Sequence, residues 1–245
     1  MLLQIILANL AVSLVSFVGL ATLVNKSFFF TKNVHLLVSF AAGVMLSAAF
    51  FDILPEALEH MDLHDGLKLV FWSIIGAFIV EKLLWHHHHH NDTHGTKPTT
   101  YLVLLGDTLH NFVDGLAIAA SFMVNPLLGI TTTAAILAHE IPQELADFAV
   151  LISTGVARKK ALLLNFVSAL AAVLGGIVGY YFLAGTENLT HQTLAVAGGV
   201  FVYIAAADLI PELHREQKDG NLFSHIVPLL FGVAILLILS NIFAH

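Results

Sequence analysis

The stretches His110-Asn111-Phe112-Val113-Asp114-Gly115 and His139-Glu140-Ile141-Pro142-Gln143-Glu144 decide the fold, because they place ionisable side chains inside two long apolar segments. Residues 101 to 155 include no Lys or Arg, but they include five carboxylates: Asp107, Asp114, Glu140, Glu144 and Asp147. A carboxylate at bilayer depth costs roughly 2.5–3.5 kcal/mol on insertion scales, so several of them together need protons, water or a bound cation. The pattern indicates membrane spans that handle a cation.

The composition places the whole chain in a membrane. Hydrophobic residues make up 58% of the chain and charged residues only 11%, whereas soluble domains are about 25% charged. Apolar runs of about 18 or more residues predict spanning helices, and eight such runs predict an all-α membrane protein of one transmembrane domain, 1–245. The runs are 2–24, 34–57, 67–85, 101–124, 127–153, 161–184, 193–212 and 224–243. The first lacks a basic leader and a small-residue cleavage site, so we interpret it as a span.

Charge and cysteine content exclude other classes. The net charge of −7 argues against a nucleic-acid partner, and the absence of Cys excludes disulfides and thiolate metal sites. The expected partners are the lipid bilayer and divalent metal ions. Eight of the ten basic residues fall in the loops after runs one, three, five and seven, and Lys82 lies at the same side, near the end of run three. Because cytoplasmic loops retain Lys and Arg, both termini are predicted to face outward.

A repeat relates the two halves of the chain. Asp52-Ile53-Leu54-Pro55-Glu56 ends the second run and Asp208-Leu209-Ile210-Pro211-Glu212 ends the seventh. With the orientation above, the two copies run in opposite directions through the bilayer, as in the inverted repeats of secondary transporters. The simpler alternative is that Pro-Glu marks two helix ends. We favour a 3+2+3 arrangement of three spans, a central pair and three inverted spans.

A run of five histidines, His86 to His90, lies in the predicted inner loop at about 86–100. Neutral imidazoles bind zinc, nickel and copper, so this loop is a candidate for holding metal loosely inside the cell. The acidic outer segment from Glu59 to Asp65 is equally well explained as a solvated loop or as a region that concentrates cations.

Two polar stripes define the candidate metal site. At 100° per residue, the polar residues of the fourth run share an arc of roughly 100°, and those of the fifth run an arc of roughly 140°. His110 and Asp114 stand one turn apart, which suits an ion with nitrogen and oxygen ligands. Pro142 frees the carbonyl of Ala138, either as a further ligand or simply as a kink. The competing interpretation, a polar helix seam, usually uses Ser, Thr and Asn. The stripes contain His110, Asn111, Asp114, His139, Glu140, Gln143, Glu144 and Asp147.

The motifs His-Asn-x-x-Asp-Gly and His-Glu-x-Pro-x-Glu resemble the signature of the ZIP (ZRT/IRT-like) metal transporters over nearly the whole chain. The resemblance implies that His110, Asn111, Asp114, His139, Glu140 and Gln143 line a mid-membrane site for one or two metals. It adds Met45 from the second span and Asn165, with Ser168, from the sixth. It also implies a multi-pass protein of the cell membrane, commonly a homodimer, that moves zinc, iron or manganese into the cytoplasm by sliding one four-span unit against a scaffold.

Three points qualify this expectation. Gln143 stands where the family usually has Glu or His, which puts a bridged two-metal site in doubt. Zinc suits the mixed His and carboxylate ligands best, but iron and manganese use the same set, so the metal stays open. His139-Glu140 begins like the zincin sequence His-Glu-x-x-His, so an intramembrane metal-dependent hydrolase is the alternative, although Gln143 replaces the second His. We expect a transporter of divalent metal, zinc first, that is not an enzyme and has no cofactor beyond the ion it carries.

Overall fold

The structure, a computed structural model, describes residues 1–19, 34–89, 97–215 and 223–243, without the side chains of 84–89, 97–102, 214–215 and 241–243. Within these ranges the chain is helical and has no strand. The first half comprises α1 (Leu2–Leu14) with the 3₁₀ turn η1 (Val15–Phe17), α4 (Val34–Ser47), the π-helical turn η2 (Ala48–Ile53), α5 (Leu54–Glu59), α6 (Leu63–His89) and α7 (Lys97–Val124). The second half comprises α8 (Pro126–Ser153), α9 (Arg158–Leu183), α10 (Glu187–Ile204), the π-helical turn η3 (Ala205–Leu209), α11 (Ile210–Arg215) and α12 (Phe223–Phe243).

The eight predicted apolar runs are helical over nearly all of their described lengths. Five helical segments of the described chain are long and apolar enough to cross a membrane: 34–59, 63–83, 158–183, 187–213 and 223–240. The first run is a shorter apolar helix, 2–17, and α7 and α8, which carry the polar stripes, fall outside the five. An all-α membrane protein is therefore confirmed, whereas the number of spans and the 3+2+3 arrangement stay predictions.

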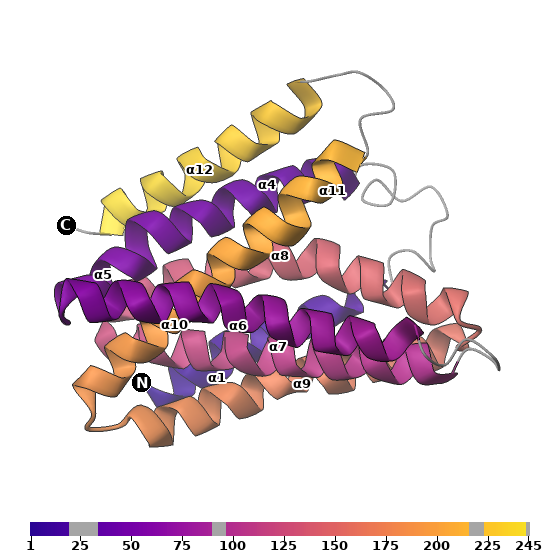
Figure 1. Ribbon diagram of the computed structural model, residues 1–245, viewed down its shortest axis with the longest axis horizontal. Coiled ribbons are helices and arrows are strands. Elements are labelled where there is room, and N and C mark those ends of the chain that lie inside the picture. Colours follow the sequence, from indigo (N-terminus) through magenta and orange to yellow (C-terminus); the bar gives the residue numbers. More distant parts are fainter. Residues whose placement is uncertain (20–33, 90–96, 216–222, 244–245) are drawn as a thin grey trace.

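Polar and apolar residues are arranged as expected for a protein in lipid. The long helices α6 and α12 lie at the edge of the bundle (Figure 1) and expose large apolar side chains such as Trp72 and Phe231. In contrast, Asp114, His139 and Glu140 are buried in the middle. Because lipid solvates apolar side chains and cannot solvate backbone or charged groups, this distribution is the stable one in a membrane.

Glycines allow the helices around the site to approach closely. A Cβ on Gly115 of α7 would lie 2.0 Å from the carbonyl oxygen of Ala172, and one on Gly175 of α9 would lie 2.1 Å from that of Phe112. The α4–α12 pair has the same reciprocal contact: a Cβ on Gly43 would lie 2.1 Å from the carbonyl oxygen of Leu229. These are small-residue interfaces of the kind that hold membrane helices together.

The two Pro-Glu copies have the same local structure. Each is preceded by a π-helical turn, η2 or η3, and each continues as a short α-helix. Proline has no N–H, and its ring collides with the carbonyl four residues earlier, so a widened turn accommodates Pro55 and Pro211 within an ongoing helix. The helices run on for three residues past each motif, to Glu59 and Arg215, so the motifs lie near the ends of these helices, as predicted.

The ends of the helices divide into two sets (Figure 1). The start of α1, the α5–α6 turn, the α9–α10 turn and the end of α12 lie at one end of the bundle. The start of α9, where Arg158, Lys159 and Lys160 stand, lies at the other. The predicted loop of 86–100 is shorter than expected, because α6 extends to His89 and α7 begins at Lys97. The side chains of the histidine run lie outside the described residues, as do the chain from 20 to 24 and the predicted inner loop around Lys26 and Lys32.

Candidate metal centre

Four side chains from α7 and α8 converge in the middle of the bundle: His110, Asp114, His139 and Glu140. α8 is placed against α7 by a tight connection, in which Pro126 opens the helix and the side-chain oxygen of Asn125 accepts a hydrogen bond from the N–H of Leu128 at 2.7 Å. The hairpin brings residues 29 positions apart into contact, and the two histidine Nε2 atoms lie 3.1 Å apart.

The separations match the edges of a small coordination polyhedron. His110 Nε2 lies 3.6 Å from Asp114 Oδ2 and 3.4 Å from Glu140 Oε1. His139 Nε2 lies 3.2 Å from Asp114 Oδ2 and 3.6 Å from Glu140 Oε1. A tetrahedral ion with ligand bonds of about 2.0–2.1 Å has ligand-to-ligand edges of about 3.3 Å. Five of the six edges among the four side chains therefore lie within a few tenths of an ångström of that value.

The donor atoms are free to bind a cation. His139 Nδ1 lies 3.2 Å from the carbonyl oxygen of Ala135, which can only accept, so Nδ1 carries the proton and Nε2 offers a lone pair to the cluster. Among the described residues, neither oxygen of Asp114 or Glu140 has a hydrogen-bond partner, and both side chains are at most 1% exposed. Buried carboxylates without donors are costly unless a cation shares their charge.

Neighbouring groups fix the orientation of this cluster. Phe201 of α10 packs against the His139 ring with centroids 6.0 Å apart. Asn111 donates to the carboxylate of Asp107 at 2.8 Å, and Ser168 of α9 donates a short hydrogen bond to the same carboxylate. Asp107 was on the predicted stripe but was not among the predicted ligands, and the structure uses it to tie α7 to α9.

A second buried pair lies further along α8. Asn165 of α9 donates to Glu144 Oε2 at 2.8 Å, and Glu144 Oε1 has no hydrogen-bond partner within the described chain. Of the predicted residues, Met45 is fully buried in the apolar core and has no polar contact with the four-residue cluster among the described interactions. The structure thus separates the predicted set into one tight group of four and several supporting residues.

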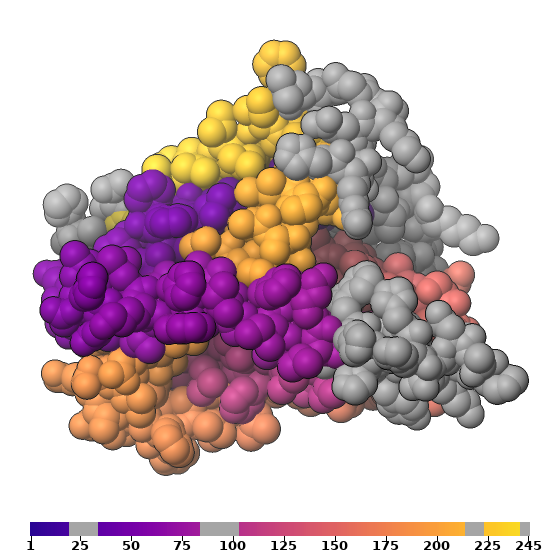
Figure 2. All heavy atoms as spheres, viewed as in Figure 1, coloured from indigo at the N-terminus to yellow at the C-terminus, as the bar shows by residue number. Residues whose placement is uncertain are grey.

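A cavity of about 1120 Å³ leads away from the cluster between α4, α6, α7, α8 and α10–α11. His110 and Gln143 line it next to the cluster, and it reaches Lys82 and Glu212, near the ends of α6 and α11. Figure 2 shows α6 and α10–α11 side by side on this face of the molecule. The lining carries five carboxylates, which are Asp107, Asp147, Glu81, Asp208 and Glu212. Such a lining raises the local concentration of cations.

Sequence reasoning placed Gln143 and Asp147 on the polar stripe of the fifth run as candidate site residues, and in the structure both line the cavity. It did not identify Glu81, which accepts a short hydrogen bond from Tyr203 at the cavity wall. Glu81 is a single acid near the end of an apolar run, so no sequence periodicity marks it. Only the packing of α6 against α10 shows that it lies at the cavity wall.

Comparison with known proteins places the chain among metal transporters. A family model described as ZIP Zinc transporter matches residues 2–100 and 81–240. Bovine metal cation symporter ZIP14 is 40% identical over 153 residues, which cover 59% of this chain and 31% of the relative. Human zinc transporter ZIP6 is 39% identical over 158 residues, which cover 62% of this chain and 21% of the relative.

The chain thus spans only about a fifth to a third of the length of these relatives. The zinc transporter ZIP13 of Pongo abelii is matched more fully, with 33% identity over 220 residues, 83% of this chain and 66% of the relative.

Proposed function

The chain belongs to the ZIP family of metal transporters, and we propose that it carries divalent transition-metal ions, zinc first, across the cell membrane into the cytoplasm. The proposed binding site consists of His110, Asp114, His139 and Glu140. The observation that supports it best is that the two Nε2 atoms and the carboxylate oxygens lie 3.1–3.6 Å from one another. In the described chain, the oxygens of Asp114 and Glu140 have no hydrogen-bond partner. The hydrolase alternative is set aside, because the family consists of transporters.

Two nitrogen and two carboxylate ligands favour zinc over harder ions. Imidazole is a good ligand for zinc and iron, and carboxylates also suit manganese. Two carboxylates neutralise the charge of one divalent ion, so the loaded site carries no net charge in the membrane interior. This neutrality removes the main electrostatic cost of holding an ion there.

The cavity supplies a route from one side of the site. His110 is the ligand that faces the cavity, so an ion leaving the cluster passes Gln143 and Asp147 on its way to the bundle end that carries the basic residues of α9. On the opposite side, buried apolar residues such as Leu194, Ile53 and Phe201 close the path. By the distribution of basic residues, the open side faces the cytoplasm, with both termini outside and eight spans in a 3+2+3 arrangement.

The supporting polar residues have distinct roles in this proposal. Asn111 and Asp107 hold α7 in register with α9, and Glu144 with Asn165 forms a weaker second position for an ion. Gln143 offers one neutral oxygen, so it guides the ion without trapping it. Met45 offers only a thioether, which is a weak ligand for a hard ion. A homodimer is the expected assembly.

Uptake of radioactive zinc by proteoliposomes tests the proposal. Asp114→Ala and His139→Ala should each abolish uptake, while Asp65→Ala, which removes an exposed carboxylate paired with Lys68, should leave uptake unchanged. Competition with Fe²⁺ and Mn²⁺ ranks the metals. Full uptake by His139→Ala would remove the four-residue cluster from the pathway.

A further inference from the structure

We propose that Glu56, His60 and His191 form a second binding site for a divalent transition metal, at the end of the bundle opposite the cavity. One ligand atom from each of the three side chains lies within 4.8 Å of the others. Glu56 and His60 are one turn apart at the end of α5, and His191 stands near the start of α10. We refer to this group as the α5–α10 site.

The two histidine rings lie face to face, and His60 Nδ1 lies 3.7 Å from the Glu56 carboxylate. Their rings stack with centroids 4.3 Å apart and an interplanar angle of 13°. His191 Nδ1 lies 2.8 Å from the carbonyl oxygen of Glu187, and His60 Nδ1 lies 3.1 Å from that of Glu56. A carbonyl only accepts, so each Nδ1 carries the proton and each Nε2 keeps a lone pair for an ion. This arrangement is the usual one for metal-binding imidazoles.

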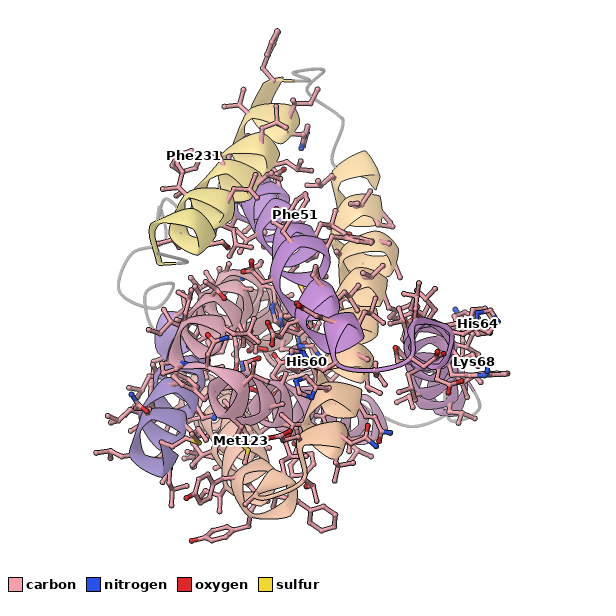
Figure 3. The ribbon with its side chains drawn as sticks, turned by 90° about the vertical axis from the view of Figure 1, so that its left-hand side faces the viewer. Phe51, His60, His64, Lys68, Met123 and Phe231 are labelled. Atoms are coloured by element: carbon pink, nitrogen blue, oxygen red, sulfur yellow. The ribbon has the colours of Figure 1, made fainter. Side chains whose placement is uncertain are left out.

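His60 and His191 lie in different surroundings from His64, the other histidine of this region. In Figure 3, His60 lies among the helices near the middle of the view, whereas His64 and Lys68 project outward from α6 at the edge of the bundle. His191 is buried, and the side chains of His60 and Glu56 are 48% and 26% exposed. A buried ligand combined with two partly exposed ones leaves room for water as the remaining ligand, so an ion would exchange readily with solvent.

The α5–α10 site is separate from the central cluster. Along α10, His191 precedes Phe201, the residue that packs on His139, by ten positions, or about 15 Å of helix. The intervening turn is closed by apolar packing, since a Cβ on Gly198 would lie 2.5 Å from a methyl carbon of Leu54. The two sites therefore bind ions independently in this conformation.

Ligand type predicts the metal. Two imidazoles and one carboxylate suit Zn²⁺, while Mn²⁺ should bind more weakly because affinity rises along the series from Mn²⁺ to Cu²⁺. Asp62, two residues after His60, adds negative charge that raises the local cation concentration, whereas the charge of Asp65 is paired with Lys68. Glu56, His60 and His191 would thus capture metal at the end of the bundle opposite the cavity.

Zinc binding measured by calorimetry on the full chain in nanodiscs tests this site. The background carries Asn in place of the five histidines His86 to His90, because those imidazoles would bind zinc themselves. His191→Ala and His60→Ala should each lose one equivalent of zinc, and the affinity of the remaining equivalent should change less than about twofold. His64→Ala, an exposed histidine of the same region, should lose none.

The chain has no Cys, which provides a second measurement. His191→Cys should keep the equivalent that His191→Ala loses, because thiolate is a strong zinc ligand, and Cd²⁺ should then give a thiolate charge-transfer band. Equal zinc stoichiometry in His191→Ala and His64→Ala, or no thiolate band in the Cys variant, would overturn the assignment. Binding is the only quantity measured, so a transport defect cannot be mistaken for the absence of this site.

Discussion

Asp114→Asn should make the metal-free protein more stable while it removes metal binding. Both oxygens of Asp114 are buried without a hydrogen-bond partner, and Oδ2 lies 3.2 Å from His139 Nε2. Because His139 Nδ1 donates to the carbonyl oxygen of Ala135, His139 Nε2 is an acceptor. It faces Asp114 Oδ2, which is also an acceptor. An Asn side chain at this position can turn its N–H₂ to Nε2, so the substitution replaces a repulsive contact with a hydrogen bond.

The size of the effect follows from the cost of a buried acceptor without a donor. That cost is about 1–3 kcal/mol and is larger for a charged group. For a protein of this length 1 kcal/mol corresponds to about 2–4 °C in Tm. We expect metal-free Asp114→Asn to unfold about 2–12 °C above the parent, with unfolding followed by the fluorescence of Trp72 and Trp85 in detergent. Zinc at 100 times its Kd stabilises the parent by about 2.7 kcal/mol, and the variant should lose most of this gain.

Asp52→Asn is the matched control. The Asp52 carboxylate already accepts hydrogen bonds from Ser240 at 2.8 and 3.0 Å, so its neutralisation should bring no gain in metal-free Tm and should leave the zinc effect intact. A metal-free Asp114→Asn protein that is no more stable than the parent, or one that keeps the full zinc shift, would refute the reasoning.

Three further expectations follow from the same contacts. Gly115→Ala should destabilise the protein by about 2–3 kcal/mol, because its Cβ would meet backbone of α9, whereas Gly76→Ala, with nothing within 4 Å, should not, as thermal unfolding will show. Gln143→Glu adds a carboxylate to the cavity wall beside the site, so it should tighten zinc binding in calorimetry and lower turnover at saturating zinc, and unchanged affinity would contradict this. Deletion of His86 to His90 should leave proteoliposome uptake within about twofold of the parent, because these residues, at and just after the end of α6, are not part of the proposed binding site.

Much of the fold could be predicted because membranes impose simple rules. Long apolar runs must be helical in lipid, so the helices were predicted at nearly their observed positions. The ends were less accurate: α6 extends to His89 and α10–α11 to Arg215, since backbone hydrogen bonds continue into polar sequence after hydropathy has dropped. The π-helical turns were not predicted, because a proline within a helix does not by itself produce one: Pro142 of α8 and Pro228 of α12 lie in helices without such a turn.

The central cluster could be predicted because its four members lie on two adjacent helices with helical spacing. Periodicity shows which side chains share a face, but not how far along the face two helices meet. That limit explains why the sequence could not separate Gln143 and Asp147, which line the cavity, from the four residues of the cluster. The α5–α10 site was not predicted, because His60 and His191 are 131 positions apart in the sequence and lack a shared motif.

The two Asp-x-x-Pro-Glu copies show how related sequence serves the two ends of one pathway. In the first copy, Asp52 is held by Ser240 and Glu56 belongs to the α5–α10 site. In the second, Asp208 and Glu212 both line the cavity. In the proposed inverted topology the copies stand at opposite faces of the membrane. Asp52 is half-buried against Ser240, whereas its counterpart Asp208 is exposed at the cavity. A carrier caught in one conformation must show this asymmetry. In the opposite conformation Asp52 should become more exposed and Asp208 should be covered. In the Cys-free chain, Asp52→Cys should therefore react faster with a soluble thiol reagent, and Asp208→Cys more slowly, once the carrier has changed conformation.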